Sequence, residues 1–273
     1  MTDSKTSCSD NLILFPDFEK LKDEVEKLRT ELSMLLSERD ELQYITCKNI
    51  ETRYMLLLGS IEYKAYEAQC TALRLKRKME LIQAKKNRQE KIILSVIEET
   101  LDNEFAEYQE QLNEQINKMN EALKRSQGEY LSKEEYKEFK KLYRTIVKAL
   151  HPDLHLDITE AQMQLFDNAV SAYQNGDLTT LRIIGEMVGS DPLPEQQKDV
   201  MTQLLEEKKR LQGLLKAISE SIETIQSEYP YTMKKIVEDP EKTKLKRQEL
   251  ENVLVQYEEI ISLYETKIKE MLR

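Results

Sequence analysis

The sequence predicts an all-α protein, in which long coiled-coil or bundle helices flank a small helical module. Glycine and proline are scarce: the 273 residues include six of each, fewer than the turns of a globular domain of this length would normally require. Charged residues make up 34% of the chain, and aromatic residues only 7%, with no Trp. Apolar residues recur at three- and four-residue spacing, which is typical of helices that bury seams against one another.

The N-terminal part is predicted to be a disordered segment, residues 1–16, followed by a coiled-coil or helical region, residues 17–127. Asp17 is a candidate cap for the first helix. Seven-residue leucine spacing then predicts a coiled-coil helix. The leucines at this spacing are Leu21, Leu28, Leu35 and Leu42. The helix is expected to reach about Leu58, with a kink or turn at Gly59-Ser60.

Further apolar stripes follow as far as residue 125, and they fit either a folded-back bundle or an extended coiled coil that dimerises. Residues 74–91 contain eight basic and two acidic residues, a net charge of +6. We interpret this stretch as a solvated helix face, and a contact for phosphates or an acidic partner is the alternative. No aromatic residues interleave with the charges, which disfavours nucleic acid as the partner.

Residues 130–188 form the predicted helical module. Ser132 and Glu135 have capping-box spacing and open a helix that runs to Leu150. One side of this helix is apolar and the opposite side is basic. The basic side carries Lys137, Lys140, Lys141, Arg144 and Lys148. A second helix, capped by Thr159 or Asp157, ends at Asn175-Gly176-Asp177, and a shorter helix covers 178–188.

The C-terminal part is predicted to be a linker followed by a helical hairpin. Residues 189–195 are rich in Gly, Pro, Ser and Asp, which is typical of a linker. Two heptad helices within residues 196–273 are separated by a segment with two prolines, from Tyr229-Pro230 to Asp239-Pro240. The pattern favours an antiparallel pair of helices.

The most distinctive stretch is His151-Pro152-Asp153, which holds one of the chain's two histidines. Pro152 stops the preceding helix and is expected to place the polar side chains on a tight, exposed turn. A histidine that merely caps the helix is the structural alternative for His151. A metal site that combines the turn with His155 and Asp157 is conceivable but disfavoured by Pro152.

The residues around this turn resemble the second helix, loop and third helix of a J-domain, the co-chaperone module of the DnaJ family. The matching positions of the second helix and loop are Tyr143-Arg144, Ile146-Val147 and Leu150-His151-Pro152-Asp153. Those of the third helix are Phe166, Ala169, Ala172 and Tyr173. The resemblance covers about residues 130–188, under a quarter of the chain.

This resemblance implies that the turn engages the ATPase domain of a DnaK-type chaperone and stimulates its ATP hydrolysis. The chaperone-binding residues would be His151, Pro152 and Asp153, with Lys137, Lys140, Lys141, Arg144 and Lys148 docking on an acidic surface. Five cations on one helix face steer an acidic partner independently of the resemblance. The coiled coils would then recruit a client, a scaffold protein or a second copy of the chain.

A structural coiled-coil scaffold, whose J-like module no longer stimulates a chaperone, is the alternative function. The family's first helix is not recognisable before Ser132, so we predict that the helix ending near Ser126 packs on Tyr143 and Phe166 instead. There is also no Gly/Phe-rich linker and no zinc-finger cysteine set, so the substrate handling of the larger family members is not implied. No Gly-rich phosphate loop or nucleophile motif is present, and neither an enzyme nor a cofactor is expected.

The composition predicts a cytoplasmic protein. The net charge of −10 argues against wholesale nucleic-acid binding. Cys8, Cys47 and Cys70 are widely spaced and odd in number, with no metal-binding spacing, as suits a reducing cytosol. The apolar run at 12–15 is too short for a signal core, and no stretch approaches the roughly 20 apolar residues of a membrane span. A membrane partner is therefore not expected.

Overall fold

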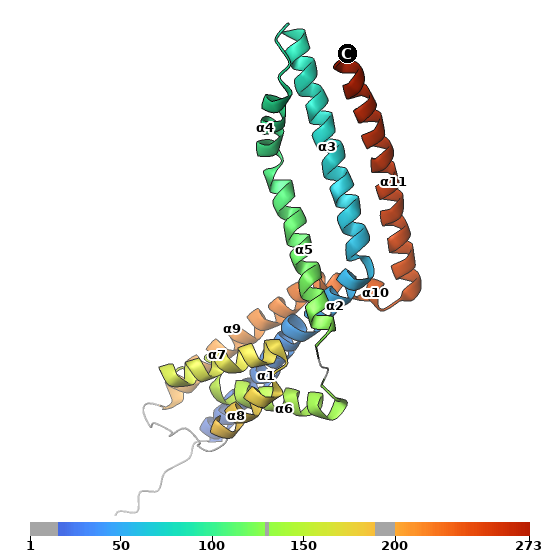
Figure 1. Ribbon diagram of the computed structural model, residues 1–273. Coiled ribbons are helices and arrows are strands. Elements are labelled where there is room, and N and C mark those ends of the chain that lie inside the picture. The colour runs from blue at the N-terminus through green and yellow to red at the C-terminus, as the bar shows by residue number, and fades with distance from the viewer. Residues whose placement is uncertain (1–15, 129–130, 189–199) are drawn as a thin grey trace, which may run out of the picture. The chain divides into compact units, whose positions relative to one another are not determined.

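The computed structural model describes residues 16–128, 131–188 and 200–273, and within these ranges the protein is all-α, without strands. The predicted all-α class is confirmed. The chain divides into two compact units (Figure 1). Unit 1 combines the chain up to Ile45 with Leu131–Ile225, and unit 2 combines Thr46–Tyr130 with Gln226–Arg273. The segments expected at 1–16 and 189–195 lie outside the described residues, apart from Pro16.

Unit 1 contains the predicted module together with a helix from each side of it in the sequence. Its helices are α1 (Pro16–Asp40), α6 (Lys133–Leu150), α7 (Glu160–Asn175), α8 (Leu178–Val188) and most of α9 (Val200–Ser227). The capping box of Ser132 and Glu135 is confirmed at the start of α6. Thr159, paired with Gln162, caps α7. That helix ends at Gly176, whose φ of 72° glycine adopts without the steric penalty of a Cβ.

One hydrophobic core holds unit 1 together. The helices α6, α7 and α8 pack against one another, and α1 lies along α6. Leu32 and Leu36 of α1 are fully buried in the same cluster as Ile146 of α6 and Leu211 of α9. The heptad pattern of α1 is therefore covered inside this unit.

Unit 2 is built around α3. Its helices are α2 (Cys47–Tyr54), α3 (Ser60–Asn87), α4 (Leu94–Glu104), α5 (Ala106–Ser126), α10 (Lys234–Val237) and α11 (Pro240–Met271). Shorter turns are the π-helical η1 (Glu41–Thr46), which begins in unit 1, the π-helical η2 (Met55–Gly59), and the 3-10 helix η3 (Tyr231–Met233). In Figure 1, α3 runs between the α4–α5 segment and α11, with α3 and α11 parallel. The residues Ile82, Ile97 and Ile268 bring α3, α4 and α11 together in one buried cluster.

The antiparallel hairpin predicted for residues 196–273 is not formed as one element, because its two helices belong to different units. Its first helix, α9, contributes Leu211, Ile218 and Ile222 to the core of unit 1. Its second helix, α11, belongs to unit 2 and packs along α3. Heptad stripes give each helix a face to bury but not the identity of its neighbour, so adjacency in sequence was the wrong guide.

A kink or turn is expected at Gly59-Ser60, and the structure excludes the turn, because the backbone stays helical through the π-helical η2 and into α3. Gly59 is buried, and a Cβ built on it would lie 3.2 Å from the sulfur of Met55. The absence of a Cβ at Gly59 therefore leaves room for the side chain of Met55.

Candidate docking site

The site begins where α6 ends. Pro152 disfavours helical backbone at the residue before it, and His151 accordingly has an extended conformation, with φ −66° and ψ 128°. The amide of Asp153 donates a hydrogen bond to Nδ1 of His151 at 3.0 Å. The side chain of His151 thus closes the turn as a local cap, which requires the tautomer with an unprotonated Nδ1.

The turn is less exposed than the sequence predicts, because His151 is only 6% exposed. Its ring packs edge-on against Phe166 of α7, with ring centroids 5.1 Å apart. Burial lowers the pKa of His151, and the nearby Asp153 carboxylate opposes that shift. The histidine therefore holds the turn in shape, and Pro152 and Asp153 carry its accessible surface.

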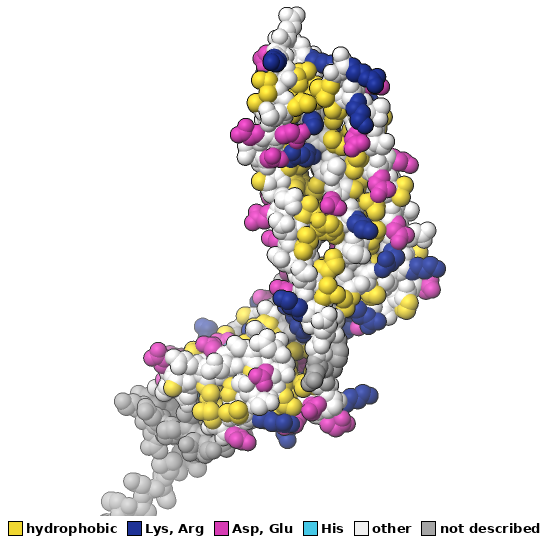
Figure 2. Space-filling view, in the orientation of Figure 1, with side chains coloured by type: hydrophobic (Ala, Val, Ile, Leu, Met, Phe, Trp, Pro, Cys, Tyr) yellow, Lys and Arg dark blue, Asp and Glu magenta, His cyan; other side chains and the backbone are white. Residues whose placement is uncertain are grey.

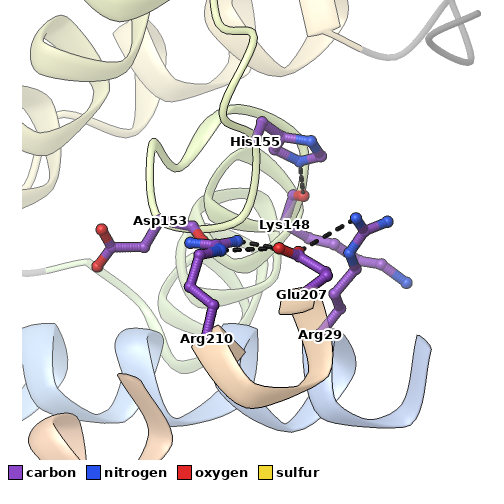
Figure 3. A network of polar contacts seen from close by, with 6 residues as sticks. All are labelled: Arg29, Lys148, Asp153, His155, Glu207 and Arg210. Carbon is purple, nitrogen blue, oxygen red and sulfur yellow. Dashed lines mark hydrogen bonds and ion pairs between the residues drawn. The ribbon is translucent and has the colours of Figure 1, made fainter. Parts of the chain in front are cut away.

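Helix α9 clamps the other side of the turn (Figure 3). Arg210 donates to the backbone oxygen of Asp153 at 2.9 Å, and its guanidinium pairs with Glu207 at 2.7 Å. Glu207 also pairs with Arg29 of α1 at 3.3 Å. The hydrogen bond from Arg210 lowers the pKa of Glu207, so the clamp stays ionised.

The carboxylate of Asp153 is left available by this arrangement. Figure 3 shows it directed away from Arg210, while the backbone oxygen of the same residue takes the hydrogen bond. No hydrogen bond or ion pair to the carboxylate oxygens occurs among the described residues. His155 is used locally instead, with its Nε2 2.8 Å from the backbone oxygen of Lys148.

A basic groove lies along α6, N-terminal to the turn. It is a depression of about 440 Å³ between α6 and α1. Its lining consists of Ser33, Lys137, Lys140, Lys141, Arg144, Thr145 and Lys148. All five cations singled out in the sequence are therefore brought together on one surface. Only Lys140 is neutralised, by Glu41 at 2.5 Å, and no ion pair to the other four is found in the described ranges.

Helix α1 packs along α6 and forms the wall of this groove. The hydroxyl of Tyr143 donates to the Asp40 carboxylate at 2.7 Å, and its ring stacks on Tyr173 with centroids 3.8 Å apart. Burial, followed by the charge of Asp40, raises the pKa of Tyr143, which keeps the hydroxyl protonated as the donor.

The prediction that the helix ending near Ser126 packs on Tyr143 and Phe166 is therefore wrong. That helix, α5, belongs to unit 2 and packs on α2, η2 and α3. In the structure, the neighbour of Tyr143 is α1, because the buried Asp40 carboxylate needs a hydrogen-bond donor and the Tyr143 hydroxyl provides one. In the sequence alone, Asp40 is indistinguishable from the other acidic residues of α1.

Several cations of the basic stretch at 74–91 are ion-paired, unlike most of those in the groove. Arg74 pairs with Glu98 at 2.8 Å and with Asp102 at 2.7 Å, and Lys78 also pairs with Glu98. Arg77 pairs with Glu104 at 2.8 Å. The acidic face of α4 therefore neutralises Arg74, Arg77 and Lys78, and these three cations are not available to a phosphate ligand.

The described ranges contain no group of three or more metal-ligating side chains placed to hold a metal ion, so the conceivable site around His151 and His155 is not assembled. Within the same ranges, no helix combines the length and apolar character needed to cross a membrane. No protein-family model matches the chain, and no match is found among curated proteins or solved structures.

Proposed function

We propose that this protein is a J-domain-like co-chaperone, which docks a DnaK-type chaperone and stimulates its ATPase. The observation that carries the proposal is the joint placement of four unneutralised cations in the basic groove and the unengaged Asp153 carboxylate at the end of the same helix. Cations along α6 attract an acidic surface, and a turn already fixed by His151 offers Asp153 with little loss of conformational entropy. The chemistry would remain in the partner's own ATPase site.

The test is single-turnover ATP hydrolysis by the DnaK-type chaperone from the organism that encodes this chain. The wild-type protein is expected to accelerate hydrolysis. The Asp153→Asn variant should accelerate it about tenfold less, because a charged acceptor is removed. Asp157→Asn is the matched control, since Asp157 is an exposed carboxylate in the same loop. Equal stimulation by wild type and Asp153→Asn would contradict the proposal.

Charge reversal distinguishes the contribution of the groove to chaperone binding from the effect of net charge. Lys141→Glu combined with Arg144→Glu should weaken chaperone binding, most strongly at low salt. Lys64→Glu combined with Lys118→Glu makes the same change in net charge at exposed positions of unit 2 and should leave binding unchanged. An equal loss for both pairs would show that only net charge matters.

A structural scaffold is the second candidate, and the Arg210 clamp is the observation that favours it. The backbone oxygen of Asp153 is already engaged by α9, so the turn can serve as a packing element inside unit 1. The scaffold is the answer if the wild-type protein binds no DnaK-type chaperone, or binds one without stimulating it, and Asp153→Asn changes neither result.

We also propose a reducing compartment, the cytoplasm, as its location. Cys47 and Cys70 are both buried free thiols in unit 2. Burial raises the pKa of each thiol, so neither is activated for exchange. Unpaired thiols of this kind suit a compartment in which disulfides are kept reduced.

A further inference from the structure

One end of unit 2 gathers residues that are far apart in the sequence. The connection between α3 and α4 and the last turn of α11 meet there, with Ile92 and Met271 packed on the cluster of Ile82, Ile97 and Ile268. In Figure 1 this is the end at which α3 finishes and the C-terminus of the chain lies. We call this end the tip.

The tip is strongly basic on a chain whose net charge is −10. Its exposed cations are Lys86, Arg88, Lys91, Lys267, Lys269 and Arg273. No ion pair to any of the six is found within the described ranges. The acidic residues of segments 83–96 and 266–273 are Glu90, which is paired with Lys85, and the exposed Glu270, against seven basic residues. The tip therefore differs from the middle of α3, where the acidic residues of α4 neutralise the cations.

Exposed aliphatic side chains lie among these cations. Ile93 is 48% exposed, Leu94 43% and Val96 50%, and Leu272 on α11 is 41% exposed. Neighbouring positions on α4, Ile97 and Leu101, are buried, so the helix has an inner apolar face and a second apolar patch facing solvent. Figure 2 shows hydrophobic and basic side chains together at this end of unit 2.

This combination selects among anionic partners. The tip segments 83–96 and 266–273 contain no aromatic residue, so they offer no platform on which bases could stack. The patch lies at the ends of helices, where a broad surface can reach both segments at once. Lys and Arg beside exposed Ile, Leu and Val are the residues that an anionic bilayer binds, through its headgroups and the boundary of its acyl chains.

We propose that the tip of unit 2 is a peripheral contact surface for an anionic lipid bilayer. Lys86, Arg88 and Lys91 bind headgroup phosphates or carboxylates, assisted by the cations at the end of α11. Ile93, Leu94 and Val96 enter the boundary of the acyl chains. This contact needs no membrane-spanning helix and does not depend on the proposed chaperone function. It departs from the sequence-based expectation of no membrane partner. The two tip segments lie about 170 residues apart in the sequence, so the sequence alone does not bring them onto one surface.

The experiment is flotation of the full chain with lipid vesicles at low salt. The wild-type protein should float with phosphatidylcholine vesicles that contain about one third phosphatidylserine, and not with phosphatidylcholine alone. The tip variant Lys86→Gln, Arg88→Gln and Lys91→Gln should lower the vesicle partition coefficient about 100-fold, since each cation near an anionic surface contributes roughly a factor of five.

A charge-matched control comes from unit 1. Lys137→Gln, Lys141→Gln and Lys148→Gln remove the same three charges from the basic groove and should change the partition coefficient by less than about threefold. Equal losses for the two triple variants would overturn the proposal, because binding would then follow net charge. Absence of wild-type flotation with the anionic vesicles would overturn it as well.

The aliphatic contribution is tested at constant charge. Ile93→Ser with Val96→Ser should lower the partition coefficient about tenfold, and Leu205→Ser, at an exposed position on α9, should leave it unchanged. Circular dichroism spectra and melting curves check that the variants keep their helices. Retention of single-stranded RNA that depends on the tip, in the absence of vesicle binding, would assign the tip to nucleic acid and overturn the lipid assignment.

Discussion

Two helices of this protein carry basic faces of similar composition, and the fold uses them in opposite ways. On α6, four of the five cations in the groove face solvent without an acidic partner. On α3, Arg74, Arg77 and Lys78 lie against the acidic residues of α4. The difference comes from the neighbouring helix, because the wall of the groove presents Ser33 whereas α4 presents carboxylates. Charge counted along one helix therefore predicts a docking surface only when the helix packed beside it is known.

Detaching α1, the wall of the groove, is the largest perturbation of this comparison. Leu36→Ala should destabilise unit 1 by about 2–5 kcal/mol, because a fully buried side chain is replaced by a cavity. Hydrogen–deuterium exchange in α1 and α6 measures the loss locally. Met34→Ala on the same helix removes a side chain that is 66% exposed, and should change stability by less than about 0.5 kcal/mol. Equal effects would show that α1 is not part of the core.

A smaller perturbation removes one hydrogen bond between the same helices. Tyr143→Phe should destabilise unit 1 by about 1–3 kcal/mol, because the buried Asp40 carboxylate loses a donor and keeps only Arg39. Urea unfolding followed by circular dichroism measures the change. Tyr136→Phe is the control, since its hydroxyl makes a longer contact, 3.4 Å to Glu41. A similar loss for both would indicate a general effect of hydroxyl removal.

The stability of unit 1 should depend on pH through His151. Burial lowers the folded-state pKa of His151 below its unfolded value of about 6.5, so the unfolded chain binds the extra proton first. This contribution to stability is complete above pH ~6.5 and declines, by up to about 1.4 kcal/mol per pH unit, as the pH falls towards the folded pKa. His151→Gln should remove the decline in the unfolding free energy of unit 1, and His155→Gln should retain it. A decline unchanged in His151→Gln would contradict this assignment.

The smallest effect on stability is expected when the cations of α3 are released from α4. Glu98→Gln with Asp102→Asn should change the unfolding free energy by no more than about 1 kcal/mol in total, since the three ion pairs that it breaks are partly exposed. The same variant should elute from heparin at higher salt than the wild type, because Arg74 and Lys78 become available. Glu99→Gln with Glu110→Gln, an equal charge change at exposed positions, should shift elution less.

Local features of the site could be predicted from the sequence because their causes are local. Ser132 and Glu135 cap a helix through neighbouring amides, and Gly176 ends one because it tolerates positive φ. The basic face of α6 follows from helical spacing alone. These features place the turn and the five cations on one helix and its end before any tertiary contact is known.

The tertiary partners could not be predicted in the same way. Heptad stripes on α1, α5, α9 and α11 are similar in composition, so nothing in the sequence selects α1 as the neighbour of α6. Arg210 reaches the turn from a helix 57 residues further along the chain. The burial of His151 likewise depends on Phe166, whose ring is placed by the packing of α7.

The composite construction of unit 1 sets the timing of its folding during synthesis. Leu36 leaves the ribosome about 110 residues ahead of Val147, with most of unit 2 encoded between them. At translation rates of about 5–20 residues per second, α6 is synthesised roughly 5–20 s after α1, and the apolar face of α1 lacks this packing partner during that time. Arg210 arrives later still, so the clamp on the turn closes last. The N-terminal helix of this protein is thus itself an exposed apolar segment, of the kind that chaperones bind, until the module it supports has been made.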